Sequence, residues 1–568
     1  MKVPILCNGG KLEVTTSLHS ALRRLRDSNQ IRRIWADAIC IDQSPKAVEE
    51  RTQQVQLMRH IYKNAKQVVI WLGEAHSESH LAISLLKKIV EVKEKLEELG
   101  SLPPSKLRFT SEVLENIGLP SDKSEGRRNK SWVSLRPLLN RDWFRRIWIV
   151  QEVTLAATAT VLCGQDEIAW DEFVTAMEVG ISSGVMVRQR AIDADTVQFL
   201  DTAQAAHLQL SRSIMSSPRY RVYNFDGLLN HLLWFRRRDA TDPRDKVFAL
   251  YGLMDFEVEC MNLRVDYRMD LSEVYRRVTL ASLEVSRNLD ILSVPRSETQ
   301  LRKQLPSWVA DWSDSSNKTM SLVGQTRHCY AASKNSEASP KLAANGWTLI
   351  LEGRIIHKIV EVASILESEN VITTPFSGFR IAAQEFSSVI DRLSRNQNVL
   401  KEWQHLAVET FSPQYPTAEI SRAAFEATLT AGIPPQLNPK ANHEDWRENE
   451  LPGPLLNKVS FNEHPWLFKG ATFLQLFQDV AAADKPEKKQ YNTMAYGRRM
   501  ARTENGYLAL VPSKTEVGDL VAVCKGGRTP IILRGRATGW ELIGDSYVHG
   551  IMNGESFNLE SCQDIYII

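Results

Sequence analysis

The chain has 568 residues, 43% of them hydrophobic and 24% charged, and its formal net charge at pH 7 is +2. This length exceeds what one hydrophobic core can organise, so we expect about three or four domains of ordinary globular composition. The small net charge gives no reason to expect bulk attraction to nucleic acid or to an anionic membrane, and no apolar run approaches the ~18 residues of a transmembrane helix.

The cysteines indicate the cellular compartment. Seven cysteines are scattered along the chain without a C-x-x-C pair. An odd number at such spacing is typical of reduced thiols and argues against a disulfide scaffold or a zinc site. The N-terminus also has too short an apolar core for a secretory signal. We therefore predict a cytoplasmic protein.

The first predicted elements are two short strands, residues 3–7 and 11–14, separated by a glycine turn. A helix capped by Ser17 follows. Residues 34–43 then form an apolar run that is typical of a strand buried on both faces. Residues 68–72 are a second such run, and the helical pattern between the two runs predicts a strand–helix–strand unit of a parallel sheet.

The first apolar run carries candidate ligand-binding residues. Asp37 lies within the run, and Asp42 and Gln43 lie at its carboxyl end. In open α/β sheets, ligands bind outside the carboxyl ends of the strands. The alternative is structural: Asp42 would cap the next helix, and Asp37 would pair with a buried donor, because buried carboxylates are rare unless they are paired.

A second candidate segment, residues 141–153, combines tryptophans and aliphatic residues with arginines and a glutamate. This composition predicts a mostly buried helix with a few placed charges. On one continuous helix Arg145, Trp148 and Glu152 share a face, because residues three and four apart are neighbours. Arg141 lies at the start of the segment.

The remaining pattern predicts a helix at residues 81–100, a loop at 101–131 and a strand at 158–163. A mainly helical stretch follows at residues 170–317 and contains one compact capped helix, residues 242–253. After it come a mixed stretch at residues 333–489 and a series of short strands from residue 506 onwards. Short strands separated by regular turn signals are typical of a small barrel or sandwich.

The common catalytic sequence motifs identify no site in this chain. The G-x-S-x-G match at 180–184 follows a helical pattern, whereas a nucleophile elbow needs a preceding strand, so we interpret it as chance. The phosphate-loop, dinucleotide and H-E-x-x-H patterns are absent. The basic residues at 236–238, 488–489 and 498–499 are interpreted as solvated faces, since aromatic residues are not interleaved with them as in a single-strand-binding groove. We therefore predict no nucleic-acid partner.

One cluster remains as a candidate site for cleaving a nucleotide glycosidic bond. An arginine can hold a phosphate, a tryptophan can stack on a ring, and a carboxylate can stabilise an oxocarbenium-like centre. Glu152 is the candidate catalytic residue, and the candidate ligand-binding residues are Asp37, Asp42, Gln43, Arg141, Arg145 and Trp148. The alternative is that Arg145 forms an ion pair with Glu152 or the two aspartates, and that Trp148 belongs to the core.

These segments resemble the fungal heterokaryon incompatibility (HET) domain. The family pattern is W-x-D-A-I-C-I-D-Q, Q-V-x-x-M-x-x-I-Y-x-x-A, V-x-W-L-G and R-x-W-x-x-R-x-W-x-x-Q-E. This chain carries the four motifs in that order at residues 35–43, 54–65, 69–73 and 141–152. Segments similar to those that often follow the domain in long family members lie at residues 242–253, 305–312 and 497–555.

The resemblance implies a role in non-self recognition, in which contact between unlike fungal cells triggers growth arrest and programmed cell death. It also implies protein partners and self-association through the HET domain. The HET domain is in turn similar to the TIR domain, a flavodoxin-like fold, and some TIR domains cleave NAD with a glutamate on a W-x-x-x-E segment. Residues 148–152 match that segment. The resemblance therefore implies a catalytic role for Glu152, with NAD as a substrate and no bound cofactor.

The family pattern opens with Y-x-A-L-S-Y-x-W-G, and this chain starts at the segment that normally follows it. We expect either a clipped gene model or a degenerate copy, in which the sheet would keep an unpaired edge.

The predicted organisation is an α/β protein of four parts. These are a TIR- or flavodoxin-like parallel-sheet HET domain without the usual first strand at residues 1–165, a mainly helical domain at 166–330, a mixed, mostly helical region at 331–490, and a small β-rich module at 491–568. The predicted function is heterokaryon incompatibility signalling, with NAD glycohydrolysis through Glu152 as the alternative. The sequence leaves open whether the chain is an enzyme.

Overall fold

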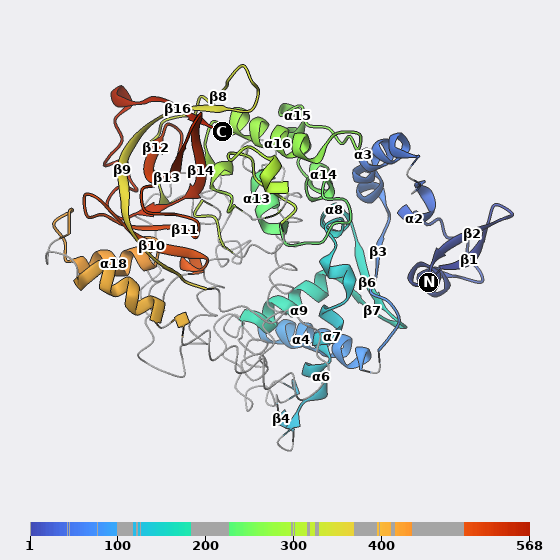
Figure 1. The fold of residues 1–568 in the computed structure, drawn as a ribbon. Coiled ribbons are helices and arrows are strands. Elements are labelled where there is room, and N and C mark those ends of the chain that lie inside the picture. The colour runs from blue at the N-terminus through green and yellow to red at the C-terminus, as the bar shows by residue number, and fades with distance from the viewer. Residues whose placement is uncertain are drawn as a thin grey trace. The chain divides into compact units, whose positions relative to one another are not determined.

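The computed structural model describes five stretches of the chain. They are residues 2–98 without 43, 45 and 77; 118–182 without 121–122 and 125–126; 227–367 without 297–298, 300, 315–318 and 324–328; 395–433 without 397 and 410–414; and 493–568. The chain divides into two compact units (Figure 1). Unit 1 comprises Met1–Val222, Arg238–Asp255 and Arg264–Asp270, and unit 2 comprises Tyr223–Arg237, Phe256–Leu263 and Leu271–Ile568.

Unit 1 begins with a hairpin. Strands β1 (Lys2–Cys7) and β2 (Gly10–Thr15) pair antiparallel, which confirms the two predicted strands. Helix α1 (Thr16–Leu25) follows directly, and its cap is Thr15, whose hydroxyl oxygen accepts a hydrogen bond from the Leu18 amide at 3.2 Å, rather than the predicted Ser17.

The sheet of unit 1 has three strands among the described residues, in the order β3, β6, β7. Strand β3 (Val68–Trp71) pairs parallel with β6 (Ala159–Cys163), and β6 pairs antiparallel with β7 (Asp166–Ala169). The predicted strands at 68–72 and 158–163 are confirmed. One parallel pair and one antiparallel pair make this part of the protein α/β.

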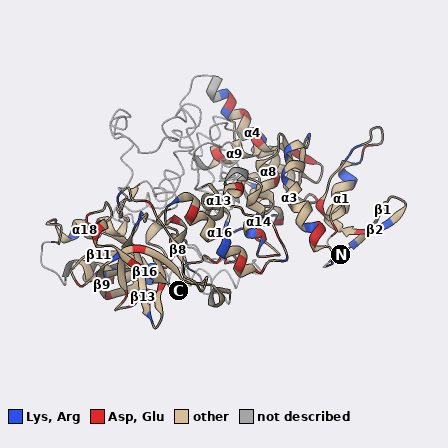
Figure 2. Ribbon diagram, turned by 90° about the horizontal axis from the view of Figure 1, so that it is seen from above, with Lys and Arg blue, Asp and Glu red and all other residues tan. Residues whose placement is uncertain are grey.

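Helices lie along this sheet. The predicted helix at 81–100 is confirmed as α4 (Ser79–Glu98), which packs against α9 (Trp170–Ser182). Figure 2 shows both acidic and basic residues along α4, and the exposed ones among its described side chains are Lys87, Lys88, Glu91, Glu94 and Lys95. Because α9 is helical up to Ser182, the G-x-S-x-G match has no preceding strand, as predicted. The predicted loop at 101–131 lies mostly outside the described residues.

The predicted buried strand at 34–43 is wrong. Residues 31–36 form no strand; Ile34 is 43% exposed, and Trp35 and Ala36 are half-buried. Asp37–Cys40 form a short helix, α2. Among the described residues of the run, only Ile41 is buried. The Asp37 carboxylate accepts the Ala38 amide at 2.8 Å, and such local hydrogen bonds compete with a strand ladder. Helix α3 (Val48–Asn64) follows as predicted. The parallel partner of β3 is β6 and not the predicted strand at 34–43.

The predicted single helix at 141–153 is also wrong. The segment forms a short 3-10 helix, η2 (Asp142–Arg145), and a separate helix, α8 (Ile149–Thr154). Arg146 between them is extended and forms a parallel bridge with Asp239. The two residues of this bridge are 93 positions apart in the sequence, so no local pattern could reveal it.

The rest of unit 1 is helical apart from one two-stranded ribbon. The predicted compact helix at 242–253 is confirmed as α14 (Asp245–Tyr251), preceded by a turn in which Asp242 accepts the Arg244 amide at 3.0 Å. The remaining elements are β4 (Lys123–Ser124), β5 (Arg127–Arg128), α6 (Lys130–Val133) and α7 (Leu135–Leu139).

Unit 2 opens with helices, as predicted for the middle of the chain. They are α13 (Gly227–Phe235), α15 (Asp255–Cys260), α16 (Leu271–Ser286) and the 3-10 turns η3 (Asp290–Ser293) and η4 (Leu301–Gln304). Trp308 and Trp312 are fully buried beyond them.

The predicted solvated basic faces are wrong where the structure describes them. Arg236 and Arg238 are 7% and 1% exposed, and Arg498 is 1% exposed. Arg236 donates to the backbone oxygens of Asp314, Pro295 and Asp311. These arginines satisfy backbone carbonyl groups inside the protein, a role that a run of basic letters does not reveal. Residues 488–489 lie outside the described residues.

The C-terminal part of unit 2 is a nine-stranded sheet in the described stretches (Figure 1). Its long strand β9 (Leu349–Ile365) pairs with β16, then β12, then β10 along its length, and the pairing of β12 with β9 closes β9, β12, β13, β14 and β16 into a ring. The strands are β8 (Lys341–Leu342), β9, β10 (Arg498–Thr503), β11 (Leu508–Pro512), β12 (Leu520–Cys524), β13 (Ile531–Arg536), β14 (Gly539–Asp545), β15 (Tyr547–Val548) and β16 (Gln563–Ile567).

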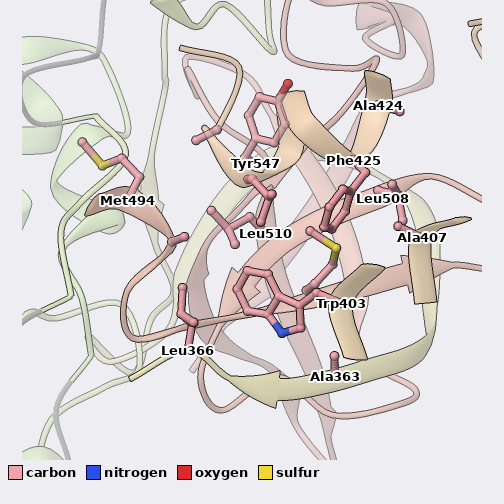
Figure 3. Packing of buried hydrophobic residues seen from close by; sticks show 14 of the residues in the cluster. Ala363, Leu366, Trp403, Ala407, Ala424, Phe425, Met494, Leu508, Leu510 and Tyr547 are labelled. Carbon is pink, nitrogen blue, oxygen red and sulfur yellow. The ribbon is translucent and has the colours of Figure 1, made fainter. Parts of the chain in front are cut away.

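Residues from helices contribute to the core of this sheet. Trp403 is fully buried, and its indole donates to the Ser364 carbonyl oxygen of β9 at 2.8 Å. Figure 3 shows its ring among Phe425 of α18 (Ser421–Leu429) and Leu510 of β11. Unit 2 also contains a π-helix, η6 (His405–Glu409), and the 3-10 helices η7 (Thr493–Ala495) and η8 (Leu559–Ser561). No helix among the described residues is long and apolar enough to cross a membrane.

Candidate functional site

Glu152 lies on α8 in unit 1 and is half-buried. The Trp143 indole and the Tyr62 hydroxyl donate hydrogen bonds to its carboxyl group. Burial raises the pKa of Glu152 to about 7, with the Arg146 cation opposing this shift and the Asp37 anion adding to it. Glu152 therefore exchanges its proton near neutral pH, whereas an ordinary glutamate is fully charged there.

Aromatic side chains surround this carboxyl group. Tyr62 comes from α3, Trp143 from η2, and Trp35 meets the Tyr62 ring edge to face with 5.6 Å between centroids. Burial, and then the nearby negative charge of Glu152, hold the pKa of Tyr62 well above its ordinary value. Tyr62 therefore remains a neutral hydrogen-bond donor.

One side of the cluster carries an accessible ion pair. Arg146 and Asp37 lie 4.0 Å apart, with their side chains 52% and 47% exposed. At this exposure the ion pair contributes little to stability. The Arg146 guanidinium group is accessible to an anion such as a phosphate. A carboxyl group that titrates near pH 7 beside an accessible cation is suited to general acid–base chemistry or to stabilising a developing positive charge.

Of the sequence-predicted site residues that the structure describes, it brings two together, Asp37 and Glu152. Asp42 is exposed, and its carboxylate accepts the Ser44 amide at 2.8 Å, which supports the capping alternative. Gln43 lies outside the described residues.

The other three predicted residues do not face Glu152. The Arg141 guanidinium group donates to the Leu72 and Glu74 carbonyl oxygens at 3.3 and 2.9 Å, so it fixes the end of β3. Arg145 is exposed, and Trp148 donates to Asp245 at 3.1 Å. The shared face predicted for Arg145, Trp148 and Glu152 does not exist, because the helix is broken at Arg146.

Sequence reasoning missed Tyr62, Trp143 and Arg146. All three occupy fixed letters of the motifs at 54–65 and 141–152. In R-x-W-x-x-R-x-W the second arginine is Arg146, not Arg145, so the motif spacing carried a signal that the helix-face argument overrode.

A second polar cluster lies on the other side of α8. Asp245 accepts hydrogen bonds from the Trp148 indole at 3.1 Å and from the Tyr267 hydroxyl at 2.5 Å, and it is only 8% exposed. Burial raises the pKa of Asp245 to about 6. Among the described residues no group of three or more His, Cys, Asp and Glu side chains could hold a metal ion.

Gly252 directly follows α14 and packs against Gln151 of α8. A Cβ atom at this position would collide with the side chain of Gln151, which is 2% exposed, although φ of Gly252 is an ordinary −63°. Gly252→Ala should therefore destabilise unit 1 by about 1–3 kcal/mol through overpacking. Thermal melts measure the loss, with Gly10→Ala as the control, since its Cβ would meet only the Cys7 carbonyl oxygen at 3.6 Å. Equal melting temperatures for the two variants would contradict this packing.

Comparison with known proteins agrees with this organisation. Residues 1–152 match the family model of the heterokaryon incompatibility protein (HET), and residues 475–568 match that of the Het-6 beta-barrel domain. Heterokaryon incompatibility protein 6, OR allele, of Neurospora crassa is 24% identical over 629 aligned positions, which cover 98% of this chain and 87% of that protein. No solved structure matches.

Proposed function

We propose that this chain, which carries a HET domain followed by a Het-6 barrel domain, is a heterokaryon incompatibility protein that acts in fungal non-self recognition and programmed cell death. The observation that carries the proposal is the presence of both domains in one chain, together with a heterokaryon incompatibility relative that aligns over 98% of its length. In this role the protein is cytoplasmic, has protein partners, and associates with itself through unit 1.

Expression in a fungal host tests this function. Induction of the full chain should slow colony growth and increase the number of cells that take up a vital dye. The control is Val150→Asp, which places a carboxylate at a fully buried position and should remove both the fold of unit 1 and the effect. Normal growth of a host in which the folded chain accumulates would contradict the proposed function.

The Glu152 cluster favours a second candidate, a TIR-like NAD glycohydrolase. In this reaction water replaces nicotinamide on the ribose: the N-glycosidic bond breaks, a C–O bond forms, and a proton is released. Positive charge develops on the sugar as nicotinamide leaves, and a carboxylate at Glu152 would stabilise it. Arg146 would bind the pyrophosphate, and Trp143 would stack on a ring. A TIR- or flavodoxin-like sheet belongs to this candidate, with which the parallel pair β3–β6 is compatible.

A further inference from the structure

The residues around Glu152 are held by two later stretches of the chain, Arg238–Asp255 and Arg264–Asp270, which we call the clamp. The HET family match ends at residue 152, before either stretch begins. Both stretches nevertheless belong to unit 1. Unit 1 therefore depends on chain that lies beyond the matched domain.

The clamp fixes the backbone on both sides of Arg146. The Ile147 amide donates to the Asp239 carbonyl oxygen at 2.9 Å, and the Asp239 amide donates to the Arg145 carbonyl oxygen at 2.6 Å. Arg238, which is buried, donates to the Phe144 carbonyl oxygen. These bonds create the break between η2 and α8, and the break directs Arg146 toward Asp37 and Glu152.

Side chains of the clamp then hold α8. Asp245, at the first turn of α14, accepts a hydrogen bond from the Trp148 indole at the start of α8. The same carboxyl group accepts a hydrogen bond from the Tyr267 hydroxyl, so one buried residue joins α8 to both stretches of the clamp. The charged groups that interact with Asp245 include Asp242, Arg51 and Arg244.

The clamp also holds α3, which supplies Tyr62. The Arg51 guanidinium group lies over the Tyr267 ring at 4.3 Å, and the Gln56 side chain donates to the Val265 carbonyl oxygen at 3.2 Å. The two helices whose side chains meet at the Glu152 carboxyl group are thus attached to one common element.

We propose that the clamp positions α3 and α8 around Glu152, and that Asp245 is its central positioning residue. The proposal rests on the Glu152 site described above. Loss of the Asp245 contacts would let α8 move and would admit water to the Glu152 carboxyl group. Asp245 itself acts only through Trp148 and Tyr267.

A pH titration of the purified full chain tests this role, because hydration of Glu152 would lower its pKa toward that of an ordinary glutamate. The Trp143 indole is hydrogen-bonded to the Glu152 carboxyl group, so its fluorescence emission reports the ionisation of Glu152. The readout is the difference in tryptophan fluorescence between each protein and its own Glu152→Gln counterpart. The other titratable groups facing Glu152 are Tyr62, Arg146 and Asp37, and all are present in both members of each pair.

The wild type should show a midpoint near pH 7. Asp245→Ala should lower the midpoint by about one pH unit or more. Asp245→Asn, which keeps a hydrogen-bond acceptor, should restore it. Asp266→Ala is the matched control, since Asp266 lies in the clamp and its side chain bonds only Arg268 in the described contacts, while its carbonyl oxygen, which accepts the Met269 amide, is kept. Its midpoint should stay at the wild-type value.

Asp245→Ala with an unchanged midpoint would overturn the proposal even if the melting temperature falls. If that variant does not fold, Trp148→Phe decides, because it keeps an aromatic ring of smaller size and removes the indole N–H donor to Asp245. An unchanged midpoint there overturns the proposal and a lowered one supports it. The proposal is also overturned if the fluorescence difference between the wild type and Glu152→Gln shows no titration midpoint. None of these measurements involves growth arrest or NAD, so the clamp and the proposed function can fail separately.

Discussion

Arg498→Met should destabilise unit 2 by about 3–5 kcal/mol, because it leaves a buried carboxylate without its cation. The Arg498 guanidinium group lies 2.6 Å from an Asp545 carboxylate oxygen, with side chains only 1% and 4% exposed. It also donates to the carbonyl oxygens of Asp545 and Met320 at 2.9 and 3.0 Å. After the substitution, the Leu322 amide still donates to this carboxylate at 2.8 Å.

Urea unfolding of the purified chain measures this loss as a shift of the transition midpoint of unit 2. The matched control is Arg502→Met on the same strand, since Arg502 and Glu361 form an ion pair with side chains 26% and 39% exposed. Such an accessible pair is worth about 0–1 kcal/mol. The double replacement Arg498→Met with Asp545→Leu should recover much of the loss, since no unpaired charge remains. Similar midpoints for Arg498→Met and Arg502→Met would contradict the burial of the pair.

Glu152→Gln should stabilise unit 1 at alkaline pH. The pKa of Glu152 is raised from 4.5 to about 7, so its protonated form is favoured in the folded state. The stability that this proton contributes is fully present below pH 4.5 and is lost as the pH rises through about 7. A shift of about 2.5 units corresponds to about 3 kcal/mol, which is the upper limit of the gain expected for the variant at pH 8. Melts at pH 8 and pH 4.5 measure it, and the difference between the two proteins should vanish at pH 4.5.

The same substitution should abolish NAD cleavage if the second candidate function holds. Glutamine keeps the shape and the hydrogen bonds but cannot carry the charge that stabilises the ribose, and losing one such contact costs about 100- to 1,000-fold in rate. The control is Glu50→Gln, an exposed residue of α3 whose carboxylate accepts the Asp42 amide at 3.2 Å. A concentrated wild type that releases no nicotinamide, or a Glu152→Gln variant that releases it normally, would refute the enzymatic candidate and leave the incompatibility function standing.

Local sequence patterns determined the elements whose partners are close or whose signals are strong. The glycine turn between the two short strand-like segments predicts the hairpin of β1 and β2. The apolar runs of β3 and β6, and the apolar stripe of α4, predict a buried sheet with a helix beside it. The turn signals after residue 506 predict the strands of the C-terminal sheet. Each of these signals lies within one element, so the sequence alone could reveal it. The motif order likewise indicated the HET domain, whose family model matches residues 1–152.

Only the tertiary structure decided the features that depend on distant partners. The break at Arg146 exists because Asp239 supplies two backbone hydrogen bonds, and without them residues 141–153 have the pattern of one continuous helix. That break replaced Arg145 with Arg146 beside Glu152 and turned Trp148 toward Asp245. Arg498 is buried because Asp545 lies opposite it, although its letters resemble a solvated face. A strand, an ion pair or a site needs both of its partners, and a sequence pattern describes one of them at a time.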